Sequence, residues 1–202
     1  ELLNRRQISV VELMQDTLAR IKTINPQVNA IISLREEADL LIQAAQADKS
    51  SRTGWMHGLP IAIKDLHDVK DMPSSMGSAI FADYIAEKDD IAVARVRAAG
   101  AIIIGKTNTP EFGLGSHTYN AVHGATYNPY DLSKSAGGSS GGAAAALSTR
   151  MLPLADGSDM MGSLRNPAAW NNVYGFRPSF GLVPSEPGAE MFLQQNTTQG
   201  PM

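Results

Sequence analysis

The sequence predicts an α/β fold in which a mixed, mostly parallel sheet is covered by helices on both faces. Two apolar runs, residues 59–63 and 101–104, are uninterrupted rather than alternating, which is typical of strands buried on both faces. A helical pattern at residues 89–99 lies between them, and the order strand, helix, strand favours parallel pairing. A content of 43% hydrophobic and 18% charged residues is ordinary for a folded globular protein.

The first element expected is an amphipathic helix near the N-terminus. Ser9 and Glu12 form the pattern of a capping box, which satisfies free backbone amides at a helix start. The following apolar residues recur at helical spacing: Val10, Leu13, Met14, Leu18 and Ile21. Asn25 and Pro26 are expected to end this helix.

The rest of the N-terminal part is expected to be a short strand and a second helix. Residues 28–34 form a strand-like segment, residues 36–48 are rich in Ala, Leu and Glu, and residues 49–55 form a polar linker. We therefore divide the chain into a helical arm with its linker, residues 1–55, and a catalytic core, residues 56–202.

Four more elements are expected in the second half of the chain. Residues 143–150 and 163–170 read as helices, whereas residues 151–156 and 173–176 read as strands. Beyond Pro184 the sequence shows turn residues without a clear period, so no element is assigned there.

Residues 100–107 match the phosphate-loop pattern GxxxxGK[ST], but their context contradicts nucleotide binding. A phosphate loop follows a strand and opens a helix at its lysine. Here a helix precedes Gly100, and three isoleucines fill the supposed loop. We interpret the segment as a helix-ending glycine followed by a buried strand.

Composition excludes several classes of function. There is no cysteine, so disulfides, thiolate metal sites and a cysteine nucleophile are excluded. The four histidines (His57, His67, His117, His123) lack metal-ligand spacing, and Gly113–Gly115 lacks the third glycine of a dinucleotide fingerprint. No metal and no cofactor is expected, and the histidines are expected in loops or behind the reacting groups.

Charge and hydropathy point away from nucleic acid and membranes. The formal net charge is −3, without the basic stripe that phosphate backbones or anionic lipids attract. The first residues lack a signal-peptide pattern, and no run approaches the roughly 20 apolar residues of a membrane span. A cytoplasmic protein is expected, and the loop-like C-terminus suggests a fragment of a longer chain.

Two serine-bearing turns each precede a helix, where hydrolytic enzymes expose hydroxyl groups beside free backbone amides. One is SAGGSSGGAAAA, residues 135–146, and the other is DGSDMMGS, residues 156–163. A flexible linker is the alternative for the first turn. Its short length and the helix directly after it argue against a linker, and the first amides of that helix are candidates to face developing negative charge.

Together with the segment IAIKD, these turns resemble the three signature blocks of the amidase signature family of serine hydrolases. The blocks IAIKD, GGSSGG and GSDMMGSLRNPAA occur in that family's order and spacing, and the resemblance extends over residues 58–184 through GKTNTPEFG and VYGFRPSFGLVP. It implies the amidase signature fold.

The resemblance implies a catalytic triad of Ser163, Ser139 and Lys64. Ser163 would be the nucleophile, Ser139 a bridging serine after a cis peptide bond at Gly138, and Lys64 the final base. A lysine can act as a base only when neutral, so its pKa must fall from about 10.4, and burial has this effect. The end of an apolar strand is a suitable place for such burial.

Further roles follow from the same resemblance. The oxyanion hole is implied to consist of the backbone amides of Met160, Met161, Gly162 and Ser163. Asp159 and Arg165 would pair to hold the nucleophile turn, Ser158 would join their network, and Ser140 would support the loop of Ser139.

The sequence departs from the family pattern at one position, since GSDMMGS stands where GTDTGGS is usual. Met161 replaces a glycine, and methionine brings bulk and prefers negative φ. This substitution could disturb the oxyanion hole or line an apolar substrate pocket.

Three functions are therefore considered. The first is an amidase that hydrolyses a small-molecule carboxylic amide through an acyl-enzyme, with a homodimer left open. The second is a component of a tRNA-dependent glutamine amidotransferase, similar to the A subunit of such complexes, which needs partner subunits. The third is an inactive scaffold, motivated by Met161 and by the shortness of the chain.

Overall fold

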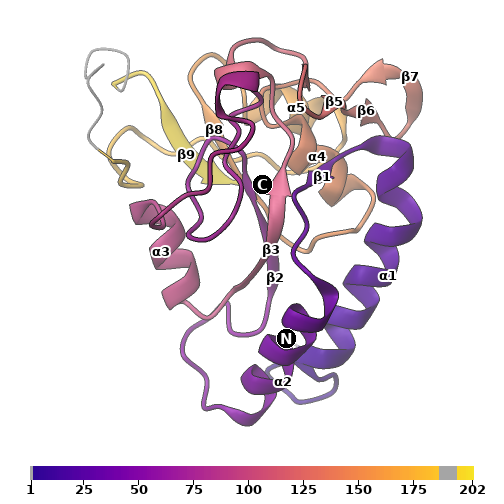
Figure 1. The fold of residues 1–202 in the computed structure, drawn as a ribbon, viewed down its shortest axis with the longest axis vertical. Helices are drawn as coiled ribbons and strands as arrows, with labels where there is room; N and C mark the ends of the chain where they lie inside the picture. Colours follow the sequence, from indigo (N-terminus) through magenta and orange to yellow (C-terminus); the bar gives the residue numbers. More distant parts are fainter. Residues whose placement is uncertain (1, 187–194) are drawn as a thin grey trace.

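The computed structural model describes residues 2–186 and 195–202 and confirms the α/β class. Strands β2 (Pro60–Lys64) and β3 (Ile102–Thr107) run through the centre. Helix α3 (Ile91–Ala98) lies on one side of them, and α1 (Val10–Val28) and α2 (Glu37–Lys49) lie on the other (Figure 1). Within the described ranges, no helix is long and apolar enough to cross a bilayer.

The central sheet has the order β1-β3-β2 and contains a β-bulge. Strand β1 (Ile31–Ile32) is antiparallel to β3, whereas β2 is parallel to β3. Ile61 pairs with Ile103, but Ile63 pairs with Lys106, so β3 contains one residue more than β2 between these pairs. Because side chains alternate along a strand, Ile63 and Lys106 share one face while Lys64 points to the other.

The remaining strands form two-stranded antiparallel pairs. These pairs are β4 (Tyr119–Asn120) with β5 (Gly124–Ala125), β6 (Tyr127–Asn128) with β7 (Asp131–Ser135), and β8 (Asp156–Asp159) with β9 (Thr198–Pro201). The sheet architecture is therefore mixed, and among the described strands only β2 and β3 pair in parallel.

The N-terminal capping box is present, but the first helix is longer than predicted. The Ser9 hydroxyl accepts from the Glu12 amide, and the Glu12 carboxylate accepts from the Ser9 amide at 2.8 Å. Helix α1 continues through Pro26 to Val28 and ends where Asn29 adopts left-handed φ and ψ. The Asn25 side chain supports this end, because it accepts from two following amides and donates to the Ile31 carbonyl.

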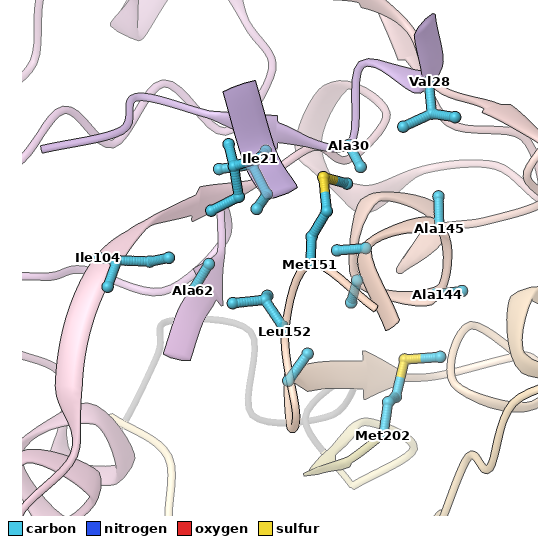
Figure 2. Packing of buried hydrophobic residues seen from close by; sticks show 14 of the residues in the cluster. Ile21, Val28, Ala30, Ala62, Ile104, Ala144, Ala145, Met151, Leu152 and Met202 are labelled. Carbon is cyan, nitrogen blue, oxygen red and sulfur yellow. The ribbon is translucent and has the colours of Figure 1, made fainter. Parts of the chain in front are cut away.

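Apolar side chains fill both sides of the central strands. On one side α1, α2 and α4 (Gly141–Ser148) pack against Ala62 and Ile104, and Figure 2 shows Ile21, Met151 and Leu152 in this cluster. On the other side Ile61, Ile63 and Ile103 pack against Val93 of α3. The arm of residues 1–55 thus shares a core with the strands, and the proposed domain boundary stays a prediction.

Predictions for the second half of the chain were partly wrong. Residues 151–155 are mostly buried but form no strand, because an apolar run signals burial and not a particular backbone conformation; β8 begins only at Asp156. Residues 173–176 also form no strand, and Phe176 makes a single backbone bond to Pro201. Helix α5 (Arg165–Trp170) starts later than expected, and β9 lies in the part left unassigned.

The segment resembling a phosphate loop is a helix end followed by a strand, as interpreted. Helix α3 ends at Ala98, Gly100 has φ +96°, and β3 begins at Ile102. Short 3₁₀ helices, η1 (Ala79–Phe81) and η2 (Glu111–Gly113), lie in the loops on either side of α3 and β3.

Candidate active site

The side chain of Lys64 is fully buried at the end of β2 and contacts three serine hydroxyls. Its Nζ lies 2.7 Å from Ser139 Oγ, 2.9 Å from Ser140 Oγ and 2.9 Å from Ser158 Oγ. Four of the residues predicted from the sequence therefore meet at one point, although they come from three separate segments of the chain.

This environment favours a neutral amine. Burial lowers the pKa of Lys64 to about 7, although the carboxylates of Asp156 and Asp159 act in the opposite direction. Neither carboxylate forms a hydrogen bond with Nζ within the described residues. A neutral amine has two N–H donors and one lone pair, so two hydroxyls can accept from it while the third donates.

The glycine-serine segment is a packed turn and not a flexible linker. The peptide bond between Gly138 and Ser139 is cis, as the resemblance implies. A Cβ at Gly138 would lie 3.0 Å from backbone atoms of His117, and one at Gly142 would lie 2.3 Å from the Asn108 amide. The approach at Gly142 requires glycine, because backbone atoms cannot move aside as a flexible side chain can, and the approach at Gly138 is tighter than most Cβ contacts.

The first amides of α4 have protein acceptors, so they do not face an open site as suggested from the sequence. The amide of Ser140 donates to the Ser163 carbonyl, that of Gly141 to Thr118 Oγ1, and that of Gly142 to the Asn108 carbonyl. The Ser140 bond joins the two serine-bearing turns. It places the partly buried Ser163 beside the lysine cluster through the backbone, and no hydrogen bond of the Ser163 hydroxyl occurs among the described residues.

Asp159 organises the turn that carries Ser163. Its buried carboxylate accepts from the amides of Gly162 and Leu164 and from both Nε and Nη2 of Arg165, each of the two at 3.0 Å. Arg177 Nε adds a third cationic contact at 3.2 Å. Burial alone would raise the pKa of Asp159, but the bonds from Arg165 and the two amides lower it to about 2.

The predicted pairing of Asp159 with Arg165 is thus present, whereas Arg177 was missed. Arg177 belongs to the block VYGFRPSFGLVP, which supported the family resemblance without suggesting a role for the arginine. It lies 18 residues after Asp159 and shares no local pattern with it.

The predicted oxyanion hole is only partly available in this structure. The Gly162 amide donates to Asp159 Oδ1 at 2.8 Å, so it is not free to bind an oxyanion. The amides of Met160, Met161 and Ser163 have no hydrogen-bond acceptor within residues 2–186 and 195–202. These three amides remain as candidate donors.

Met161 fits the turn without conflict. Its φ is not positive, whereas the neighbouring Gly162 has φ +120° and takes the conformation that favours glycine. The Met161 side chain is 87% exposed, so its bulk meets no obstacle. The turn therefore accommodates methionine at position 161 without positive φ and without a steric clash.

Known proteins with similar sequences and structures are amidases and components of amidotransferases. Residues 12–202 match the family model described as Amidase. The chain is 45% identical to the A subunit of the glutamyl-tRNA(Gln) amidotransferase of Coxiella burnetii over 99% of its own length. It is 44% identical to the corresponding protein of Alkaliphilus metalliredigens over 89% of its length.

Solved structures give the same result. A bacterial aryl acylamidase of the amidase signature family superimposes with a TM-score of 0.90 at 32% identity, covering 99% of this chain. A peptide amidase in complex with the competitive inhibitor chymostatin gives 0.88 at 32% identity, also over 99%. This chain spans about 42% of the length of the Coxiella protein and of the aryl acylamidase, and 43% of the peptide amidase.

Proposed function

Because this chain belongs to the amidase signature family, we propose that the whole protein hydrolyses small-molecule carboxylic amides through a serine acyl-enzyme. The observation that carries the proposal is the 2.7 Å contact between Ser139 Oγ and the buried amine of Lys64, whose pKa is about 7. A buried amine surrounded by hydroxyls is suited to exchanging protons with them near neutral pH.

In the proposed acylation step, Ser163 Oγ attacks the amide carbon as its proton passes to Ser139 and the proton of Ser139 passes to Lys64. The resulting oxyanion would be held by free amides of the nucleophile turn, for which Met160, Met161 and Ser163 are the candidates. When the C–N bond breaks, the proton returns through Ser139 to the leaving nitrogen. Ammonia or an amine departs and the acyl ester on Ser163 remains.

In the proposed deacylation step, water replaces the departed amine. Its oxygen attacks the ester carbon while one proton passes through Ser139 to Lys64. The proton then returns to Ser163 Oγ as the ester C–O bond breaks. The products are a carboxylic acid and the original enzyme, so no other reactant is consumed.

A second proposed function is that of an amidotransferase component, and the identity to the A subunits of two such enzymes favours it. The structural similarity does not favour it further, because the A subunit from Thermotoga maritima gives a TM-score of 0.77, against 0.90 for the aryl acylamidase. One of the two reasons for considering the third function, an inactive scaffold, no longer applies, because Met161 does not disturb the turn.

A fluorophosphonate probe on the full-length protein tests the shared chemistry. We expect covalent labelling of Ser163, loss of labelling in Ser163→Ala, and unchanged labelling in the exposed control Ser51→Ala. An unlabelled Ser163 in a folded full-length protein would contradict the proposed nucleophile.

Ammonia release then separates the two enzymes. Release from simple amides by the isolated protein supports the hydrolase. Release from glutamine that occurs only in the presence of partner subunits supports the amidotransferase component instead.

A further inference from the structure

His67 is buried in the turn after β2, next to the predicted base. Only 8% of its surface is exposed, and its amide donates to the Lys64 carbonyl at 3.0 Å. Its Nδ1 lies 3.1 Å from Gln199 Nε2 and 3.6 Å from Asp90 Oδ2. Its buried Nε2 has no hydrogen-bond partner within the described chain, and the carboxylate oxygen Asp156 Oδ2 lies 3.9 Å away.

Asp156 connects this ring to Lys64. While Oδ2 faces His67, Oδ1 accepts from the backbone amide of Lys64 at 2.7 Å. The negative charge of Asp156 opposes the effect of burial on the pKa of Lys64. A group that holds or partly neutralises this carboxylate therefore also acts on the lysine.

We propose that His67 is a positioning residue, which directs an Nε2–H toward Asp156, holds that carboxylate against the Lys64 backbone, and weakens its electrostatic effect on the Lys64 amine. The consequence for turnover rests on the proposed function, but the effect on the amine does not. An Asn or Gln side chain at position 67 would still offer N–H donors from its amide NH₂ group, whereas an apolar side chain would offer none.

The sign of the effect is the same for a neutral and for a protonated imidazole. In either form an N–H that points at Asp156 reduces the field of the carboxylate at Lys64. Its removal strengthens that field, so Lys64 should bind its proton more tightly. Removing the charge of Asp156 should have the opposite effect, and Asp156→Asn keeps an oxygen that accepts from the Lys64 amide.

The other charged groups around His67, Asp156 and Lys64 are the same in all the variants that are compared. Lys106 Nζ contacts the His67 carbonyl and Asp65, and Asp90 also accepts from the Asp68 amide. Asp159, which likewise raises the pKa of Lys64, is held by two arginines. The charged groups facing this region are Asp65, Asp68, Asp90, Lys106, Asp159, Arg165 and Arg177.

The test is a pH titration of Lys64 in the full-length protein. It is monitored by NMR of ¹³C-labelled lysine in a Ser163→Ala background. We expect His67→Leu to raise the midpoint by about half to one pH unit, and Asp156→Asn to lower it by about one unit. His67→Gln should shift it less than His67→Leu. Adding His67→Leu to Asp156→Asn should change nothing further, because the charge that His67 acts on is gone.

His57→Leu is the matched control, since His57 is also 8% exposed and contacts the Ala47 carbonyl in another part of the chain. An unchanged or lowered midpoint in folded His67→Leu would overturn the inference, as would unfolding of both His67 variants, which would give the ring a purely structural role. In active protein, the acid limb of kcat/KM should move with the NMR midpoint. Midpoint shifts in a protein without turnover would support the inference while contradicting the proposed function.

Discussion

Two fully buried lysines on neighbouring strands of one sheet have different surroundings. Among the residues that the structure describes, the Lys64 amine of β2 forms hydrogen bonds only with the hydroxyls of Ser139, Ser140 and Ser158. Lys106 of β3 lies 3.1 Å from the Asp65 carboxylate, 2.8 Å from the His67 carbonyl and 2.8 Å from Ser74 Oγ.

The difference teaches what distinguishes a structural amine from a candidate base. The Asp65 carboxylate stabilises a protonated Lys106 through its charge, and the His67 carbonyl can only accept a hydrogen bond from that amine. Hydroxyls can also donate, so the Lys64 site can satisfy the lone pair of a neutral amine. The ligand set of a buried lysine is therefore more informative about its role than its burial alone.

The largest expected effect is on the Lys64 side of this comparison. Lys64→Met should lower kcat/KM of the full-length protein by about 10³-fold or more, because the proton of the nucleophile loses its final acceptor. Lys49→Met, which removes an exposed lysine at the end of α2, is the control and should leave kcat/KM unchanged. A Lys64→Met variant that keeps a tenth of the activity would show that the base lies elsewhere.

The next effect concerns stability on the Lys106 side. Lys106→Met should destabilise the protein by about 3 to 5 kcal/mol, because the carboxylate of Asp65, which is only 1% exposed, would lose its cation. Urea unfolding of the full-length protein measures the change. Adding Asp65→Asn should recover part of the loss, and no recovery would mean that packing and not charge determines the cost.

The smallest expected effect is on the pH dependence of stability and concerns Asp159, a third buried charged group to set beside the two lysines. Its folded pKa of about 2 lies below the ordinary value of about 3.9, so its contribution to stability is complete above pH 4 and is lost as the pH falls toward 2. Screening at the half-exposed Arg165 limits this contribution to about 1 to 2 kcal/mol. Asp159→Asn should flatten the pH dependence of urea unfolding between pH 4 and pH 2, and an unchanged slope would contradict the assignment.

Local patterns were sufficient to predict several features of the molecule. Ser9 and Glu12 form the predicted capping box, and the apolar run before Lys64 predicted its buried strand. The order and spacing of the family blocks predicted that Ser139 and Lys64 act together, and the two are in contact. Ser158 was expected in the network of Asp159 and Arg165, and Ser140 as a support for the Ser139 loop, but both hydroxyls also contact Lys64.

What the sequence could not predict depends on partners far along the chain. Arg177 reaches Asp159, and His67 lies between Asp90 and Asp156, without any periodic or spaced pattern that relates them. Strand β9 forms because its backbone pairs with β8, although its residues, TQGP, do not alternate. The occupied amide of Gly162 is likewise a property of the folded turn.

The extra residue of β3 determines toward which face of the paired strands each buried lysine points. If β2 and β3 paired without the β-bulge, Ala62 would pair with Ile104, Ile63 with Gly105, and Lys64 with Lys106. The two amines would then emerge on the same face of strands about 5 Å apart, and their mutual repulsion would oppose folding. A single inserted residue thus directs the two amines to opposite faces of the strands, and deleting Ile104 should bring both to the same face.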